Sequence, residues 1–183
     1  AEPGGRPVIR SEVTVDDIVA SCRRRVEPVA RANGVTITTA LSDATVPVDR
    51  VRMEQALANL VMNAVTHARA GGSVDVIAAV DEHDPAGRRL LIDVLDRGPG
   101  IPPQARQRIF EPFERAGATG GVGLGLATAA AAVRAHGGAI GVEPRSGGGS
   151  RFWLWVPLQP ARAPEPARVG PGHGVDQSEV GRP

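Results

Sequence analysis

The first part of the chain has the apolar period of a helix. Apolar residues recur at helical spacing between Ile18 and Val29, and the pattern stops before Asn33. Thr14 precedes this run and is followed three residues later by Asp17, a spacing that resembles a capping box. The pattern predicts an amphipathic helix that begins after Thr14. Its run CRRRV fans around the helix, which favours a solvated face over a binding patch.

A second helix is expected between Asp49, whose side chain can cap it, and about Arg69. Residues 59–68 read NLVMNAVTHA, which is typical of a buried helix except for Asn59 and Asn63. These two amides stand one helical turn apart and therefore face the same way. A buried amide without a partner costs of the order of a few kcal/mol. The pair therefore indicates a bound group, with hydrogen bonds to backbone as the alternative.

Five runs have the composition of strands. They are rich in β-branched or alternating apolar residues and occupy residues 34–41, 73–80, 89–96, 139–144 and 151–158. A turn containing Asp, Pro and Gly joins the second run to the third, and the turn RSGGGS joins the fourth to the fifth. Two hairpins are predicted.

The C-terminal half adds two helices and a tail. The segment PQARQRIF (103–110) predicts a short helix, and an alanine-rich run predicts a long one that stops at Gly137. From Pro160 onward the chain is mainly Pro, Gly, Ala and charged residues, which cannot bury enough surface to fold. This order of elements favours an α/β layer structure with a mixed sheet and a disordered tail.

The composition excludes several kinds of chemistry. A length of 183 residues favours one domain with a substantial core, and a formal net charge of +1 argues against nucleic-acid binding. The chain has no lysine, which excludes a Walker-type phosphate loop, a protein-kinase ATP lysine and a Schiff base. Its single cysteine, Cys22, cannot form an internal disulfide or hold zinc alone, and it fits a reducing compartment.

No membrane span or signal sequence is predicted. The longest mostly apolar run is too short and too glycine-rich to cross a bilayer, and the N-terminus lacks the pattern of a signal peptide. The chain opens on AEPGGRP, whose proline and glycines are typical of a linker. We therefore expect a piece of a longer protein.

The segment DRGPG follows a predicted strand. Asp96 would leave the sheet there, and Gly98 and Gly100 would let the backbone approach a flat ligand closely. A carboxylate in this position can accept a hydrogen bond from the amino group of a base. An ordinary turn with an Asx cap is the alternative.

The segment GGVGLGLA (120–127) opens the alanine-rich helix. Its glycines can expose successive backbone N–H groups at a helix N-terminus, which makes an anion cradle that needs no lysine and suits a polyphosphate. A flexible linker is the alternative, but the large apolar residues Val122, Leu124 and Leu126 are not typical of a flexible linker. Upstream, RIFEPFER (108–115) has two phenylalanines that could anchor a mobile lid over a ligand.

Together, these segments resemble the catalytic ATP-binding domain of bacterial sensor histidine kinases, in the superfamily of GHKL ATPases and kinases with the Bergerat fold. MEQALANLVMNAVTHA resembles the N box, DVLDRGPGIP the first glycine box, RIFEPFER the F box and GGVGLGLA the second glycine box. The resemblance implies a two-layer α/β sandwich: a mixed sheet of about five strands, about three helices and an ATP lid. It assigns residues 1–12 to a linker, 13–158 to the catalytic domain and 159–183 to the tail.

The resemblance also implies roles for individual residues. Asn63 would hold a Mg²⁺ ion that bridges the ATP phosphates, with Asn59 near the same ion, and these two form the catalytic pair. Asp96 would accept from the adenine amino group, and Ser150 would lie near the base. The remaining ATP-binding residues are those that would shape the adenine wall or face the phosphates: Thr66, His67, Gly98, Gly100, Ile101, Arg115, Gly121, Val122, Gly123, Leu124, Gly125 and Leu126.

Thr66 departs from the family pattern, and Asn59 distinguishes this chain from other enzymes of the superfamily. Thr66 stands where relatives usually have a lysine, so phosphate binding is expected to be weaker or to use an arginine such as Arg69. Asn59 stands where ATPases and serine kinases of this superfamily carry a glutamate that can act as a general base. An amide cannot take a proton, which disfavours hydrolysis.

The implied function is to bind Mg·ATP and to donate its γ-phosphoryl group to a histidine on the protein's own dimerisation domain, upstream of residue 1. A cognate response regulator would receive the phosphoryl group next. The parent would be a homodimer that can be anchored in a membrane, with this domain in the cytoplasm, and the domain alone would turn over little ATP. The alternatives are an anti-sigma-factor-type serine kinase and a degenerate module that binds nucleotide or protein without catalysis.

Overall fold

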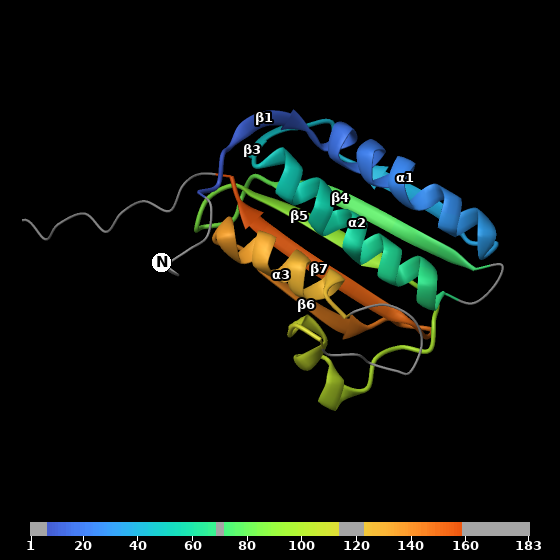
Figure 1. Cartoon of the computed structure of the whole chain (residues 1–183). Coiled ribbons are helices and arrows are strands. Elements are labelled where there is room, and N and C mark those ends of the chain that lie inside the picture. Colours follow the sequence, from blue (N-terminus) through green and yellow to red (C-terminus); the bar gives the residue numbers. More distant parts are fainter. Residues whose placement is uncertain (1–6, 69–71, 114–122, 159–183) are drawn as a thin grey trace, which may run out of the picture.

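The computed structural model describes residues 7–68, 72–113 and 123–158. Three helices lie side by side on one face of a five-stranded sheet, which makes two layers (Figure 1). The helices are α1 (Val15–Ala32), α2 (Arg50–His67) and α3 (Gly125–Ala135). The strands are β1 (Ser11–Thr14), β2 (Thr36–Leu41), β3 (Thr45–Val48), β4 (Ser73–Asp81), β5 (Arg89–Leu95), β6 (Ala139–Pro144) and β7 (Ser150–Pro157).

The large sheet has the strand order β2-β4-β5-β7-β6. β2 runs parallel to β4, while the other neighbouring pairs are antiparallel, so the sheet is mixed. The two predicted hairpins, β4–β5 and β6–β7, are both present. The predicted two-layer α/β fold is confirmed.

The core lies between the sheet and the helices. Alternate residues of the central strands point to the helical layer because side chains of a strand alternate between its faces. The largest fully buried side chains on these strands are Leu90, Ile92, Phe152 and Leu154. They belong to one buried cluster with apolar residues of α1, α2 and α3, so the helical layer is held against the sheet.

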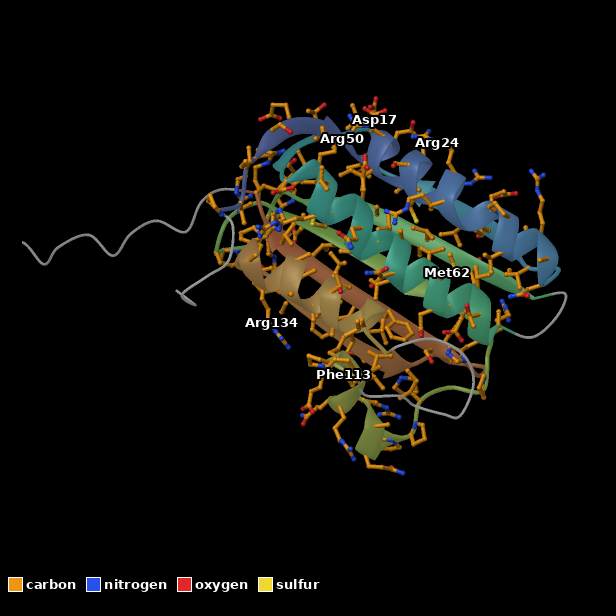
Figure 2. The ribbon with its side chains drawn as sticks, in the orientation of Figure 1. Asp17, Arg24, Arg50, Met62, Phe113 and Arg134 are labelled. Atoms are coloured by element: carbon orange, nitrogen blue, oxygen red, sulfur yellow. The ribbon has the colours of Figure 1, made fainter. Side chains whose placement is uncertain are left out.

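Both long helices begin where the sequence predicts. The Thr14 hydroxyl accepts a hydrogen bond from the Asp17 N–H (3.1 Å), and the Asp49 carboxylate accepts one from the Arg52 N–H (3.2 Å). Each cap satisfies a backbone donor that the first helical turn leaves free. Exposed polar side chains such as Asp17 and Arg24 lie on the solvent side of α1 (Figure 2). The three arginines of the run CRRRV are exposed, as a solvated face predicts, whereas its Cys22 and Val26 are buried.

Three details differ from the sequence-based expectation. Residues 103–110 form two 3₁₀ turns, Pro103–Ala105 and Arg108–Phe110, rather than the one short helix expected. Neither turn has a side-chain cap, and a segment this short cannot offset the cost of starting a helix. β1 and β3 form a separate antiparallel ladder that the sequence analysis did not predict, and α2 ends at His67 rather than at about Arg69.

The expected linker and tail fall mostly outside the described residues. Residues 1–6 and 159–183 are not among them, and β1 begins at Ser11, inside the expected linker. Among the helices of the described part, none is long and apolar enough to cross a membrane.

His136 joins three elements at the end of the domain where β1 lies. Its side chain is buried, its Nδ1 lies 2.8 Å from the Ala132 carbonyl, and its Nε2 accepts from the Asp49 N–H at 3.0 Å. The Arg10 guanidinium donates to the His136 carbonyl (3.1 Å). The neutral ring, with its proton on Nδ1, satisfies both contacts, whereas a proton on Nε2 would displace the Asp49 N–H.

Burial lowers the pKa of His136 below its usual value. Arg10 and Arg52 lower the pKa further, and the Ala132 carbonyl and Asp49 oppose them. The folded state therefore holds the imidazole neutral at a pH where an unfolded chain would protonate it.

We expect the fold to lose stability as the pH falls below about 6.5, the pKa of an imidazole in an unfolded chain. In that range the unfolded state binds more protons than the folded state, so the free energy of unfolding decreases with decreasing pH. Urea unfolding at roughly pH 7.5 and 5.5 should show a larger loss for the parent than for His136→Gln, by about 1 kcal/mol. An equal loss in both chains would contradict this explanation.

Candidate functional site

Asn59 and Asn63 lie on the side of α2 that faces the start of α3. A Cβ atom built on Gly125 would lie 3.7 Å from the Asn59 Cγ, so the first turn of α3 packs beside this amide. Both asparagine side chains are half-buried. Within residues 7–68, 72–113 and 123–158, neither amide has a hydrogen-bond partner. The backbone alternative for these amides is therefore not what the described structure shows.

Thr66 and His67 form the exposed end of the same helix. The Thr66 hydroxyl donates to the Met62 carbonyl at 2.7 Å, so its hydrogen is already used within α2. The His67 carbonyl lies so close to Gly98 that a Cβ on Gly98 would be 2.5 Å from the carbonyl oxygen. The end of α2 and the DRGPG segment therefore touch, and only glycine fits at position 98.

Asp96 follows β5 directly and is 3% exposed. Its Oδ1 accepts two backbone hydrogen bonds, from the Gly98 N–H (2.7 Å) and from the Ser150 N–H (3.2 Å). Because both bonds fall on Oδ1, the second oxygen, Oδ2, can accept from a ligand. Burial raises the pKa of Asp96 above its usual value, while the two N–H donors, His67 and Arg145 act in the opposite direction.

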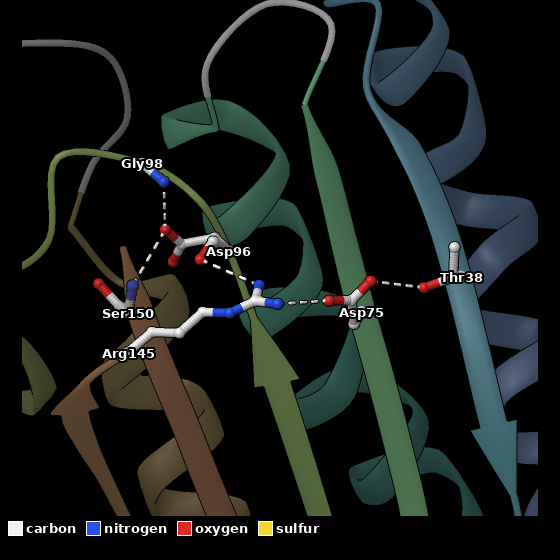
Figure 3. A network of polar contacts seen from close by, with 6 residues as sticks. All are labelled: Thr38, Asp75, Asp96, Gly98, Arg145 and Ser150. Carbon is white, nitrogen blue, oxygen red and sulfur yellow. Dashed lines mark hydrogen bonds and ion pairs between the residues drawn. The ribbon is translucent and has the colours of Figure 1, made fainter. Parts of the chain in front are cut away.

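Ser150 reaches Asp96 through its backbone rather than through its hydroxyl (Figure 3). It donates its N–H to Oδ1, and its carbonyl accepts from the Asp96 N–H at 2.9 Å. The preceding residue, Gly149, has a φ of 96°, and a Cβ there would lie 2.1 Å from the Asp96 carbonyl oxygen. The β6–β7 turn therefore lies directly against the strand end that carries Asp96.

Three residues that no sequence motif identified form a chain of contacts that starts at Asp96: Arg145, Asp75 and Thr38. Arg145 donates to the Asp96 carbonyl (3.4 Å) and to the Asp75 carboxylate (2.9 Å), and Thr38 donates to the same carboxylate (2.6 Å). These residues lie on three different segments of the chain (Figure 3). The position of Arg145 beside the glycine-rich turn before Ser150 was the only signal that could have identified it.

The two ends of the expected lid meet. The Phe113 N–H donates to the Gly123 carbonyl at 3.2 Å, which joins the F box to the second glycine box. Phe110 is buried, and its ring meets that of Phe152 edge to face at 6.4 Å between centroids, whereas Phe113 is 72% exposed. Of the two phenylalanines predicted to form a hydrophobic anchor, Phe110 is therefore packed into the core and Phe113 is not, and the lid between them and Gly123 lies outside the described residues.

The remaining predicted residues divide into two groups. Gly100 and Ile101 lie in the turn after Asp96, where Gly100 has a φ of 78°. Gly123, Leu124, Gly125 and Leu126 lie at the start of α3. Arg115, Gly121 and Val122 lie outside the described residues, as does Arg69. In the segment of α2 from Asn59 to His67, the first residue thus lies beside the start of α3 and the last lies beside the turn that follows Asp96.

The donor set determines which ligands could bind. Half-buried amide oxygens without protein partners suit a hard cation that keeps several waters and also binds phosphate oxygens, which is how Mg²⁺ is usually held. Among the described residues, no group of three or more His, Cys, Asp or Glu side chains could form an all-protein metal site. The amides therefore fit a metal ion that arrives with a phosphorylated ligand.

Comparison with known proteins also indicates a nucleotide-binding domain. The family model described as "Histidine kinase-, DNA gyrase B-, and HSP90-like ATPase" matches residues 48–160. The alginate biosynthesis sensor protein KinB of Pseudomonas aeruginosa is 35% identical over 78% of this chain and 24% of its own length. Sensor protein CutS of Streptomyces coelicolor is 37% identical over 82% of this chain and 37% of its own length. The chain thus spans between 24% and 37% of the length of these relatives.

Solved structures agree in fold. Full-length ShkA in complex with AMPPNP superposes with a TM-score of 0.74 at 34% identity, covering 88% of this chain and 34% of ShkA. The nucleotide-free catalytic domain of histidine kinase ThkA superposes with a TM-score of 0.72 at 26% identity, covering 81% of this chain and 95% of that domain. The chain therefore belongs to the family of histidine kinase-, DNA gyrase B- and HSP90-like ATPases, as an ATP-binding catalytic domain of the sensor histidine kinase type.

Proposed function

We propose that this domain binds Mg·ATP between α2, the DRGPG turn and the start of α3, and donates the γ-phosphoryl group to a histidine on a dimerisation domain of the same protein. The observation that carries the proposal is the arrangement of α2. Its paired amides face the start of α3, and its last residue touches the turn after the buried Asp96. A nucleotide laid along this segment would have its base at one end and its phosphates at the other.

The base would be recognised at Asp96. Its Oδ2 is available to accept from the adenine amino group, since Oδ1 is occupied by the Gly98 and Ser150 N–H groups. Gly98, Gly100 and Ile101 would form the adjoining wall, where the glycines allow a flat base to approach the backbone. Ser150 supports this site through its backbone, and His67 would lie between base and phosphates.

The phosphates would lie between α2 and α3. Asn63 would ligate Mg²⁺, which would neutralise phosphate charge during transfer, and Asn59 would bond to the ion's waters. Gly123, Leu124, Gly125 and Leu126 stand at the α3 N-terminus, where the helix dipole favours an anion. We further propose Arg115, Gly121 and Val122 as phosphate-side residues, together with Thr66.

Asn59 favours transfer to histidine over other reactions. A water or serine hydroxyl needs a base to remove its proton, and the amide of Asn59 cannot serve. A neutral imidazole already carries a lone pair and needs less help from this domain. The Asn59 amide stands beside Gly125, where a carboxylate base would face the phosphate end of the site. The serine-kinase alternative is therefore disfavoured.

The wider role follows from the relatives, which are sensor proteins and histidine kinases. We propose that the parent is a homodimer whose phosphohistidine passes the phosphoryl group to an aspartate of a response regulator. In this proposal the domain works in the cytoplasm.

The transfer step can be tested by extending the chain. The parent protein with its upstream dimerisation domain, incubated with Mg²⁺ and γ-labelled ATP, should acquire label that is lost in acid and stable in base, as phosphohistidine is. The same protein with Asn63→Ala should acquire little label. Acid-stable label would instead indicate a serine kinase, and would contradict the proposal.

Thr66→Lys should tighten ATP binding. Thr66 is exposed at the end of α2, so a lysine there would add a positive charge near the phosphates without burying it. Loss of the hydroxyl bond to Met62 should cost little, because lysine is a better helix former than threonine. We expect the dissociation constant for ATP to fall about threefold to tenfold, as one partly exposed charge pair would give.

The control for this prediction is Thr39→Lys, which adds the same charge on the edge strand β2. Isothermal titration calorimetry on both variants separates a local contact from a general effect of net charge. An unchanged or raised dissociation constant for Thr66→Lys would remove the proposed role of this position.

A further inference from the structure

Arg145 connects Asp96 to the rest of the sheet. It is the first residue after β6, its side chain is 15% exposed, and its guanidinium bonds in two directions. Nη1 donates to the Asp96 carbonyl (3.4 Å), and Nη2 donates to the Asp75 Oδ2 (2.9 Å) (Figure 3). A guanidinium this deeply placed needs such partners, because an unpaired buried charge is costly.

Asp75 and Thr38 fix the far side of this contact. Asp75 lies on β4, where it pairs with Leu95, the residue just before Asp96. The Thr38 hydroxyl on β2 donates to the Asp75 Oδ1 at 2.6 Å. The Thr38 hydrogen bond, and after it the hydrogen bond and charge of Arg145, hold the pKa of Asp75 below its usual value against the opposing effect of burial. The network therefore crosses three neighbouring strand ends.

The same arginine also anchors the turn that supplies an N–H to Asp96. The Arg145 N–H donates to the Gly149 carbonyl (3.1 Å), and its carbonyl accepts from the Gly148 N–H (3.1 Å). After Ser146, the three residues from Gly147 to Gly149 all have positive φ. Three successive glycines have little intrinsic preference for one conformation, so the turn depends on its contacts. The Ser150 backbone ties its end to Asp96, and the Arg145 side chain ties its start to the same strand end.

We propose that Arg145, held by Asp75 and Thr38, is a positioning residue that aims the Asp96 carboxylate at the amino group of adenine. The proposal rests on the proposed role of Asp96 in binding the base. The Arg145 guanidinium fixes the Asp96 backbone directly. Because Arg145 begins the turn that ends at Ser150, the same contact also holds that turn, which supplies the Ser150 N–H to Oδ1, against the strand end. Asp96 is thereby held on both sides while Oδ2 faces the ligand.

A purely structural role for Arg145 makes a different prediction. If Arg145 only ties the β6–β7 hairpin to the sheet, its loss should weaken all nucleotides equally. If it aims Asp96, its loss should weaken ATP much more than purine riboside triphosphate, which has the same ring and phosphates but no amino group. The ratio of the two dissociation constants therefore separates the two roles.

The experiment measures both dissociation constants in the 183-residue chain and two variants. We expect Arg145→Gln to weaken ATP about fivefold or more, the scale of coupling within one hydrogen-bond network, and to weaken purine riboside triphosphate less than about twofold. Arg151→Gln is the matched control, since Arg151 lies on β7 and pairs with Asp93 (2.9 Å) and Glu143 (3.2 Å). It should change neither constant.

If Arg145→Gln does not fold, Asp75→Asn provides a second variant, which should likewise raise the dissociation constant for ATP relative to that for purine riboside triphosphate. Equal weakening of both nucleotides, or no change in the ratio for either variant, would overturn the role of Arg145. A parent chain that binds ATP no better than purine riboside triphosphate would instead overturn the proposed role of Asp96, so the two failures are distinguishable.

Discussion

The buried carboxylate of Asp96 is the constraint on which the proposed site depends. A carboxylate that is 3% exposed must be paired with donors, and it receives them from two segments far apart in sequence, at Gly98 and Ser150. These bonds join the end of β5, the turn that follows it and the β6–β7 hairpin. Because both bonds use one oxygen, the same arrangement that stabilises the strand end leaves the other oxygen for recognition.

The second half of the proposed site depends on packing rather than on hydrogen bonds. α2 and α3 approach each other at Gly125, where a Cβ atom would be in ordinary van der Waals contact with the Asn59 side chain at 3.7 Å. The cost of leaving two amides half-buried without a described partner is acceptable if a ligand supplies that partner. The buried carboxylate at the strand end thus has its hydrogen-bond donors within the protein, whereas in this proposal the two amides on α2 obtain their partners from the bound nucleotide and its metal ion.

Much of this arrangement could be predicted from the sequence, for identifiable reasons. Helix caps at Thr14 and Asp49 and the two hairpins are encoded locally, so periodicity and turn residues were enough. Resemblance to the family boxes predicted Asn59, Asn63 and Asp96. The β1–β3 ladder was missed because each strand has four residues, too few for a clear period.

The contacts of Arg145 and Ser150 were not predictable in the same way. Arg145 meets a partner 70 residues away, and no local pattern specifies that contact. Ser150 was expected near the base because of its side chain, yet its backbone makes the bonds to Asp96. Sequence motifs therefore identified the groups that would touch the ligand, while the residues that hold those groups in place required the structure.

The central claim is that one site binds the base through Asp96 and the phosphates through a metal ion. Titration of the chain with a fluorescent ATP analogue, with Mg²⁺ and with EDTA, tests it most directly. The account predicts saturable one-to-one binding that weakens in EDTA, is lost in Asp96→Asn and is retained in Asp93→Asn, which makes the same change on the outer face of β5. Binding that is indifferent to both the metal and Asp96, or no saturable binding at all, would contradict it.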